Sequence, residues 1–244
     1  MNLSRETVLV TGASSGIGAA MARAALTRGA RVVAHYHTNR SGAEAAIASA
    51  PERAHLVDAD LADKHAVDAM FLTLREANFL PSVLVSNAAE AAGGDVLDTA
   101  AWEHQYHNVF LAALHPAQAF LAQEDQHERF RKLLFTSSIY GSLEHAYAPM
   151  PQYSVMKAAV SQLTRVLARE YAPNVLVNAI APGWTETPAW DDAGDAERQY
   201  YRKQTLIERF VAPDDVAHLA LATLENDALT GQIITIDGGV RATA

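Results

Sequence analysis

A tyrosine and a lysine four residues apart, Tyr153 and Lys157, are the pair in this chain most able to do chemistry. If the segment is helical, their side chains share one face, with Cβ atoms about 5–6 Å apart. A lysine ammonium at that distance is expected to lower the tyrosine pKa from about 10. Such a tyrosine can give a proton to an alkoxide or take one from an alcohol. Taken alone, the pair also fits a core tyrosine beside a lysine that extends to solvent.

A glycine-rich turn, TGASSGIG at residues 11–18, supplies a context for this pair. It follows an apolar run and opens a helix-like stretch. Gly12 permits a tight turn, while Gly16 and Gly18 let the backbone approach a pyrophosphate and the helix pack on a sheet. The amides and the dipole of a helix N-terminus favour phosphate. A glycine motif alone is a weak signal, and the strand-turn-helix order strengthens it.

Short apolar runs alternate with helical stretches along the whole chain. The runs expected to form buried parallel strands are 7–10, 31–34, 54–57, 82–85, 133–136, 175–178 and 233–236. The stretches expected to be helices are 16–28, 42–49, 63–77, 101–123, 152–171 and 213–224. Gly29 is a candidate cap for the first helix. The alternation predicts an α/β fold of the Rossmann type, with residues 1–244 forming one domain around a doubly wound parallel sheet.

Between residues 184 and 204 the apolar periodicity fades, and acids stand beside aromatic residues. We expect a mobile helical lid over a site at about 184–205, with a plain surface insertion as the alternative.

Composition excludes several classes of partner. The chain has 244 residues, of which half are apolar, and a formal charge of −9 without a cluster of Lys and Arg. Nucleic acid and anionic membranes are therefore poor partners. The chain contains no cysteine, no apolar run of about 20 residues and no signal-peptide pattern, so a cytoplasmic protein is expected. Ten histidines are present, but no pair has the further ligands that a zinc site needs, so no metal is expected.

The glycine spacing G-x-x-x-G-x-G resembles that of the short-chain dehydrogenase/reductase family. The resemblance runs from about residue 7 to 239. Further matching segments, in the family's order, are Asp60-Leu61, Ser86-Asn87-Ala88-Ala89, Thr136-Ser137-Ser138, Tyr153 with Lys157, Pro182-Gly183 with Thr185 and Thr187, and Asp237-Gly238-Gly239.

The resemblance implies an oxidoreductase that interconverts a ketone or aldehyde and an alcohol with a nicotinamide cofactor. Ser138 would hydrogen-bond the substrate oxygen, and Tyr153 would transfer the proton. Lys157 would hold the nicotinamide ribose and lower the tyrosine pKa, and a shift of about three units corresponds to roughly 4 kcal/mol. Ser137 is the alternative serine, and Ser138 is preferred because Gly141 follows it by three residues.

The cofactor-binding residues expected from this resemblance are Gly12, Ser14, Ser15, Gly16, Ile17, Gly18, Tyr36, His37, Arg40, Asp60, Leu61, Asn87, Ala88, Tyr153, Lys157, Pro182, Gly183, Thr185 and Thr187. Tyr36 stands where NAD-preferring relatives carry an acid. Arg40 and His37 could bind a 2′-phosphate, so NADP(H) is favoured over NAD(H). Ser15 lacks the extra basic residue of many NADP-dependent relatives, which leaves NAD(H) open.

Many family members also carry a helix asparagine that completes a proton relay to the lysine. A gap-free alignment anchored on Trp102 places Val109 at that position and Asn108 one residue earlier. One residue rotates a helix position by about 100°. Either the helix shifts locally and Asn108 is catalytic, or Asn108 does not reach the relay.

The substrate pocket is expected to include Glu90, Glu144, His145, Tyr147, Met150, Trp184 and Trp190. Their chemistry favours a small polar carbonyl or alcohol, such as a sugar or an aminocyclitol. Two other functional classes compete: a dinucleotide-binding sensor of the same fold with little catalysis, and a non-redox enzyme such as a halohydrin dehalogenase.

A homo-oligomer, most simply a tetramer, is expected because the 152–171 helix carries more apolar surface than one buried face requires, and an apolar C-terminus could form a second interface.

Overall fold

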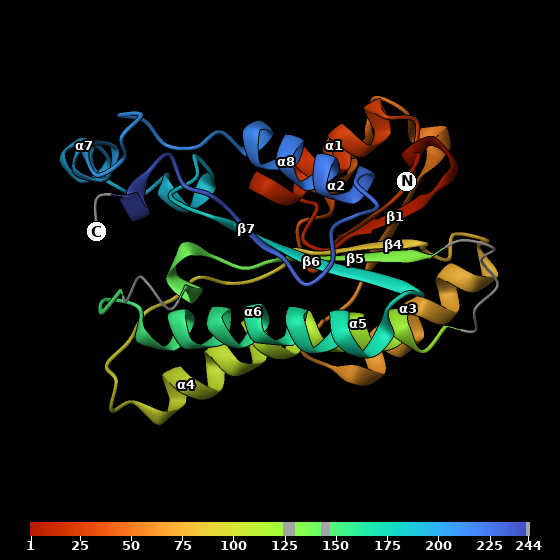
Figure 1. The fold of residues 1–244 in the computed structure, drawn as a ribbon, viewed down its shortest axis with the longest axis horizontal. Coiled ribbons are helices and arrows are strands. Elements are labelled where there is room, and N and C mark those ends of the chain that lie inside the picture. Colours follow the sequence, from red (N-terminus) through yellow and green to blue (C-terminus); the bar gives the residue numbers. More distant parts are fainter. Residues whose placement is uncertain (124–129, 143–146, 243–244) are drawn as a thin grey trace.

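The computed structural model of the chain describes residues 1–123, 130–142 and 147–242. These residues form three layers, with a parallel sheet between two groups of helices (Figure 1). The seven strands of that sheet lie in the order β3-β2-β1-β4-β5-β6-β7. Their bounds are β1 Thr7–Val10, β2 Arg31–Tyr36, β3 Ala54–Asp58, β4 Val83–Ser86, β5 Arg131–Thr136, β6 Val175–Pro182 and β7 Ile233–Ile236.

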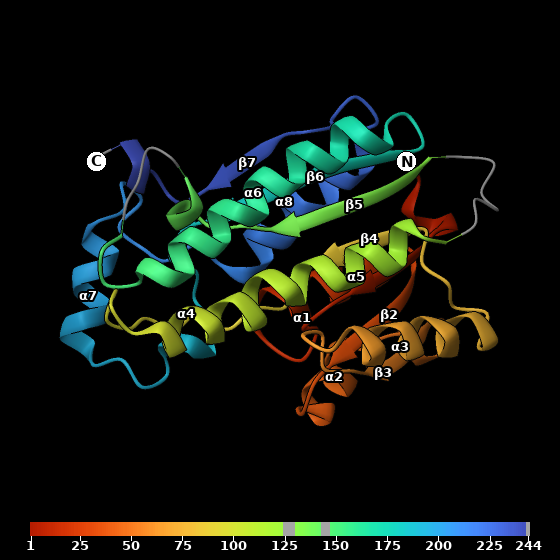
Figure 2. The same cartoon turned by 90° about the horizontal axis from the view of Figure 1, so that it is seen from below.

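Helices cover both faces of the sheet, as the two perpendicular views show (Figures 1 and 2). On one face lie α1 Gly16–Thr27, α2 Arg40–Ile47 and α8 Pro213–Glu225. On the other lie α3 Lys64–Glu76, α4 Thr99–Gln105, α5 Ala112–Leu121 and α6 Pro151–Tyr171. Each face has its own apolar core, around Met21 and Leu221 on the first and around Leu74 and Phe120 on the second. Burial on both faces explains why the central strands are almost continuously apolar.

The strand order reverses beside β1. The chain passes outward from β1 to β2 and β3, and then returns to the other side of β1 at β4. Leu9 of β1 is therefore paired with Val33 on one side and with Leu84 on the other. Loops that leave neighbouring strands in opposite directions open a crevice at the carboxyl ends of the strands, where α/β proteins bind ligands.

The seven strands and the doubly wound topology confirm the fold predicted from the sequence. Strand β5 begins two residues earlier than predicted, because Arg131 and Lys132 are buried polar members of it. Lys132 Nζ donates to Asp227 Oδ1 at 2.7 Å and to the Asn226 carbonyl at 2.8 Å, so its charge is paired inside the protein. Gly29 has a φ of +85° just after α1, as expected of a residue that ends a helix.

The helix predicted over 101–123 is interrupted. Its described residues form α4, a π-helical turn from Tyr106 to Leu111, and then α5. A π turn shifts the register of the side chains that follow it, and such turns are frequent at functional sites. Apolar periodicity alone does not reveal this shift.

The segment predicted as a lid contains a short 3₁₀ turn, Pro188–Trp190, and the helix α7, Asp195–Lys203. It lies at the carboxyl end of the sheet, beside the C-terminal turn (Figure 1). None of the helices in the described part of the chain combines the length and apolar character needed to cross a membrane.

Candidate active site

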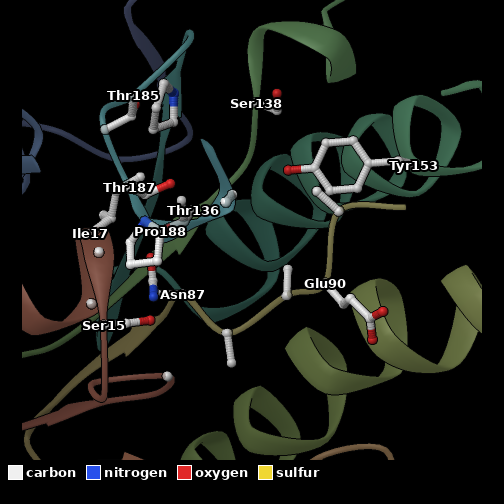
Figure 3. A pocket seen from close by; sticks show the side chains of 18 of the residues that line it. Ser15, Ile17, Asn87, Glu90, Thr136, Ser138, Tyr153, Thr185, Thr187 and Pro188 are labelled. Carbon is white, nitrogen blue, oxygen red and sulfur yellow. The ribbon is translucent and has the colours of Figure 1, made fainter. Parts of the chain in front are cut away.

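A cavity of about 780 Å³ opens at the carboxyl ends of β1, β4, β5 and β6, and Figure 3 shows it from close by. The sequence-predicted site residues that line it are Gly12, Ser14, Ser15, Gly16, Ile17, Gly18, His37, Asn87, Ala88, Ser138, Tyr153, Lys157, Pro182, Gly183, Thr185 and Thr187. The sequence-predicted site residues outside its described lining are Tyr36, Arg40, Asp60, Leu61 and Asn108. The fold thus brings most of the predicted site together from segments far apart in the chain.

The glycine turn forms one end of the cavity and requires its glycines. Gly12 and Gly16 have φ values of +65° and +51°, in the left-handed region that favours glycine. A Cβ added at Gly18 would stand 2.1 Å from the carbonyl oxygen of Gly12. Ser15 precedes α1 in extended conformation without a side-chain cap, which leaves the amides of the first turn directed at the cavity.

A buried histidine, His35, forms a hydrogen bond with the backbone of this turn. The Gly12 N–H donates to His35 Nδ1 at 3.2 Å, and His35 Nε2 lies 3.1 Å from the Ala59 carbonyl, to which it must donate. The His35 carbonyl also accepts from Ala13 N–H at 2.8 Å. Burial lowers the pKa of His35 to about 4, so the ring is neutral at physiological pH. His35 was not among the site residues selected from the sequence, although a histidine within an apolar strand signals an internal partner.

The Thr11 hydroxyl connects the loop after β1 to the loop after β4. Thr11 Oγ1 accepts from the backbone N–H groups of Asn87 at 2.8 Å and Ala88 at 3.0 Å. Asn87 Nδ2 returns a hydrogen bond to the Thr11 carbonyl at 3.1 Å. The cavity wall after β4 is therefore held in register with the glycine turn after β1.

Tyr153 and Lys157 lie one helical turn apart on α6, as the sequence predicted. The Tyr153 hydroxyl points into the cavity (Figure 3), and Lys157 Nζ lies 5.6 Å from the centre of the Tyr153 ring. Lys157 is 3% exposed, and its Nζ donates to the Thr136 carbonyl at 2.7 Å.

The expectation that Lys157 lowers the pKa of Tyr153 is wrong for this state of the protein. Burial raises the pKa of Tyr153 to about 12, and a hydrogen bond with Ser138 opposes this only in part. Burial also lowers the pKa of Lys157 to about 7. Because burial drives both groups toward their neutral forms, it outweighs the attraction that the sequence suggested.

The two candidate serines have different environments. Ser138 lines the cavity, and its Oγ accepts from the Tyr140 N–H at 3.2 Å. Ser137 Oγ instead donates to the Lys157 carbonyl at 3.1 Å and lies 2.7 Å from Ser161 Oγ. Ser137 thereby fixes α6 against the end of β5, and the geometry supports Ser138 as the serine that meets a substrate.

Asn108 lies inside the π turn, so the helix does shift locally. Its Nδ2 donates to the His104 carbonyl at 3.0 Å and lies 3.2 Å from His104 Nδ1. Val109, the gap-free match to the relay position, is 1% exposed in the core. The Asn108 side chain is thus engaged with His104 along its own helix.

Some residues of the segment after β2 line the cavity and others do not. His37 lines the cavity together with Thr38 and Asn39, which sequence reasoning had not selected. Asn39 Oδ1 accepts from Gly42 N–H at 3.0 Å and caps α2. Arg40 is exposed at the start of α2 and pairs with Glu44 at 2.8 Å.

The remaining predicted cofactor residues lie outside the described lining of the cavity. The Tyr36 hydroxyl donates to Asp58 Oδ1 at 3.4 Å. Asp60 Oδ1 accepts from Ala62 N–H at 2.9 Å, and Leu61 is buried beside it. These side chains shape the loop after β3.

Five aromatic residues form the opposite side of the cavity, and we call them the aromatic wall: Tyr140, Tyr147, Trp184, Trp190 and Tyr201. The Tyr140 and Tyr147 rings are stacked with centroids 4.3 Å apart. Trp184 Nε1 donates to the Tyr140 hydroxyl at 2.5 Å, and the Tyr147 and Tyr201 hydroxyls are 2.6 Å apart. Sequence reasoning missed Tyr140 and Tyr201.

Of the other pocket residues expected from the sequence, Glu90 and Met150 line the cavity. Glu144 and His145 lie outside the described residues. Within the described part of the chain, no group of three or more metal-ligating side chains is assembled.

Known proteins match this chain over nearly its full length. A family model described as enoyl-(acyl carrier protein) reductase matches residues 12–241. The 3β-hydroxysteroid dehydrogenase 1 of Eggerthella lenta is 33% identical over 252 residues, covering 98% of this chain and 95% of the relative. The cis-4-hydroxycyclohexanecarboxylate dehydrogenase of Sinomonas cyclohexanicum is 34% identical, with 96% of each chain covered.

Solved structures agree with these relatives. A short-chain dehydrogenase from Burkholderia cenocepacia in complex with NADP is 30% identical, with a TM-score of 0.87 over 98% of this chain and 99% of that one. The chain belongs to the short-chain dehydrogenase/reductase family. It is an NAD(P)(H)-dependent oxidoreductase that interconverts a carbonyl group and an alcohol.

Proposed function

We propose that Tyr153 is the proton donor of a carbonyl reductase, with Ser138 and Lys157 as its partners. The observation that carries this proposal is the convergence of the Tyr153 hydroxyl, Ser138 and the buried Lys157 on one cavity whose far end is the glycine turn. Ser138 and Tyr153 together would hydrogen-bond the oxygen on which negative charge develops. Tyr153 would complete the reduction by protonating that oxygen.

The residues around the glycine turn fit a nicotinamide dinucleotide. A Cβ at Gly16 would press within 3.1 Å of Thr187, so only glycine leaves this narrow passage open. Thr136 Oγ1 is buried at the cavity with no partner among the described residues. Gly12, Gly16 and the first turn of α1 would hold the pyrophosphate, and Lys157 would hold the nicotinamide ribose. When bound, the cofactor supplies or accepts the hydride.

The acid–base state of the site suits Tyr153 as a proton donor. Because burial raises the pKa of Tyr153 to about 12, its hydroxyl is protonated at neutral pH and ready to donate. Because burial lowers the pKa of Lys157 to about 7, this lysine exchanges protons easily near neutrality. The Asn108 amide is engaged with the His104 carbonyl in its own helix, so we assign its side chain no part in the relay.

NADP(H) is the cofactor that the segment after β2 favours. His37 lines the cavity there, and Arg40 stands in the first turn of α2, where its guanidinium pairs with Glu44. The carboxylates that line the described cavity, Glu90 and Glu197, belong to its substrate end. A 2′-phosphate would meet His37 and compete with Glu44 for the Arg40 guanidinium. An oxidoreductase from Pseudomonas aeruginosa, solved with NADPH, is similar at 27% identity and a TM-score of 0.87.

The segment at about 184–205 acts as a substrate lid in this proposal. Arg198 Nη1 donates to the Trp190 carbonyl at 2.8 Å, and Arg198 also pairs with Glu186 at the base of the segment. These contacts hold α7 over the cavity while leaving its outer face in solvent. The lid presents Trp184, Trp190 and Tyr201 to a small polar substrate.

We also propose a cytoplasmic homotetramer. Val155 and Val166 on the outer face of α6 are 50% and 48% exposed, and a partner subunit could cover both. The isoleucines of β7, at the edge of the sheet, are half-buried. Two such faces on one subunit fit the two interfaces that a tetramer with twofold symmetry needs. The absence of cysteine suits a reducing compartment.

The test compares wild type with Tyr153→Phe in the oxidation of NADPH and NADH by a panel of ketones and aldehydes. Tyr106→Phe, at a tyrosine exposed outside the cavity, is the matched control. We expect turnover to be lost only in Tyr153→Phe, while cofactor binding persists in all three proteins. Tight cofactor binding without turnover by wild type across the panel would instead favour a dinucleotide sensor.

A further inference from the structure

Aromatic rings surround the substrate end of the cavity. The Tyr201 ring lies 4.9 Å from Trp184 and 5.0 Å from Trp190, both in edge-on geometry. Tyr140 meets the Tyr153 ring edge-on at 6.4 Å, so the wall reaches the reacting hydroxyl. The faces of such rings carry partial negative charge and attract cations.

The polar atoms of the wall are mostly engaged with one another. The Trp184 indole N–H is donated to the Tyr140 hydroxyl, and the Tyr147 and Tyr201 hydroxyls form their own hydrogen bond. A polyhydroxylated substrate would need several of these groups as partners. What the wall offers instead is the surface of its rings.

One carboxylate at this end has no cationic partner. Glu197 lines the cavity one helical turn before Tyr201, and in the part of the chain that the structure describes it takes part in no ion pair. Glu90, by contrast, lies 3.4 Å from His104, and its carboxylate points away from the Tyr153 ring (Figure 3).

Two arginines of the same helix pair with a different carboxylate. Arg198 and Arg202 both pair with Glu186, at the base of the lid. Burial is the main cause of the raised pKa of the Tyr201 hydroxyl, the Tyr147 hydroxyl adds to it, and the Glu197 carboxylate adds a smaller part. An exposed carboxylate that forms no ion pair among the described residues thus stands near the Tyr201 ring.

We propose that the substrate bears an ammonium group, which binds between Glu197 and the rings of Trp190 and Tyr201 while its carbonyl carbon faces Tyr153. This proposal rests on the proposed function, since Tyr153 fixes where the carbonyl lies. It narrows the polar substrates to amine-bearing ketones and their alcohols. It also predicts that carboxylates are disfavoured, because Glu197 would repel a substrate anion.

Three cyclohexanones of similar shape and different charge test the proposal. They are 4-(dimethylamino)cyclohexanone as the cation, 4-isopropylcyclohexanone as the neutral isostere and 4-oxocyclohexanecarboxylate as the anion. With NADPH, we expect kcat/KM for the cation to exceed that for the neutral ketone by about two- to fivefold, as an ion pair with an exposed carboxylate gives. The anion should be the poorest of the three.

Single substitutions test whether Glu197 and the Tyr201 ring cause the preference for the cationic ketone. Glu197→Gln should reduce the cation-to-neutral ratio about two- to fivefold. Tyr201→Leu, which removes a ring, should reduce it as well, whereas Tyr201→Phe retains the ring and most of the preference. Asp195→Asn, which removes a neighbouring charge outside the cavity lining, is the control and should leave the ratio as in wild type.

Turnover of the neutral ketone with no preference for the cation would overturn this inference and leave the proposed function standing. If none of the ketones is reduced, binding of 4-(dimethylamino)cyclohexanol to the enzyme with NADPH decides the matter through tryptophan fluorescence. Binding that Glu197→Gln weakens would support the ammonium site while contradicting the proposed catalytic role. The absence of such binding would overturn the inference.

Discussion

Replacing the buried lysine should stabilise the protein while removing its activity. Lys157 is 3% exposed, and its pKa falls from 10.5 to about 7 because burial disfavours the ammonium. Each pKa unit is about 1.36 kcal/mol, so keeping this lysine charged at pH 6 costs about 5 kcal/mol relative to the unfolded chain. Lys157→Met removes that cost.

The variant also loses one favourable contact. Lys157 Nζ donates to the Thr136 carbonyl at 2.7 Å, and a buried carbonyl left without a donor costs about 1–3 kcal/mol. The expected net gain at pH 6 is therefore about 2–4 kcal/mol. In a chain of this length, that gain raises Tm by roughly 5–15 °C.

The pH dependence of the stability difference shows whether the buried Lys157 charge is its cause. The unfolded chain keeps the lysine proton up to pH 10.5, whereas the folded protein releases it near pH 7. Between these values the unfolded state binds more protons, so wild-type stability rises with pH and approaches that of the variant. The advantage of Lys157→Met should be largest at pH 6, shrink as the pH rises, and reverse near pH 10, where the lost hydrogen bond to the Thr136 carbonyl outweighs the remaining cost of the charge.

Thermal unfolding of wild type and Lys157→Met from pH 6 to 10, without cofactor, makes the measurement. Lys64→Met, at a lysine that is 40% exposed, is the matched control and should change Tm little at any pH. A Lys157→Met protein that is less stable than wild type throughout this range would refute the reasoning.

Three further changes test separate parts of the account. Arg40→Ala should weaken NADPH binding about tenfold or more and leave NADH binding nearly unchanged, as titration calorimetry would show; equal losses would remove Arg40 from phosphate recognition. Gly18→Ala places a Cβ 2.1 Å from the Gly12 carbonyl oxygen, so it should displace the turn and abolish binding of both cofactors; wild-type affinity would mean that the turn adapts. Val155→Lys should dissociate the oligomer in analytical ultracentrifugation, and a wild type already monomeric at micromolar concentration would contradict the tetramer.

Much of the fold was predictable because parallel strands buried on both faces leave nearly continuous apolar runs. The start of β5 was not, because Arg131 and Lys132 look like loop residues until Asp227 and the Asn226 carbonyl are brought to Lys132. The π turn at Tyr106–Leu111 was equally hidden, since a one-residue register shift leaves the apolar pattern almost unchanged.

For the candidate site too, part could be predicted from the sequence and part depends on the tertiary structure. The glycine turn, Tyr153 and Lys157 follow from local spacing, which sequence carries directly. The pKa shifts of Tyr153 and Lys157 depend on how much protein covers them, which only the tertiary structure defines. The role of His35 beneath the turn was missed for the same reason.

The aromatic wall is the part of the site that the sequence predicted least well. Tyr140 and Tyr147 follow β5, whereas Trp184 follows β6 and Tyr201 lies on α7, so their contacts arise only when these segments fold together. Glu197 and Tyr201, one helical turn apart, were the detectable local signal. Their spacing on a polar helix did not distinguish a pocket-facing pair from a solvated one.

The most direct test of the central claim follows the hydride itself. A ketone reduced by the protein with NADPH deuterated at the transferring C4 position should yield an alcohol carrying one deuterium on its carbinol carbon, as mass spectrometry would show. Tyr153→Phe should bind the same cofactor and form almost none of this product. An unlabelled alcohol, or full activity in Tyr153→Phe, would contradict the account.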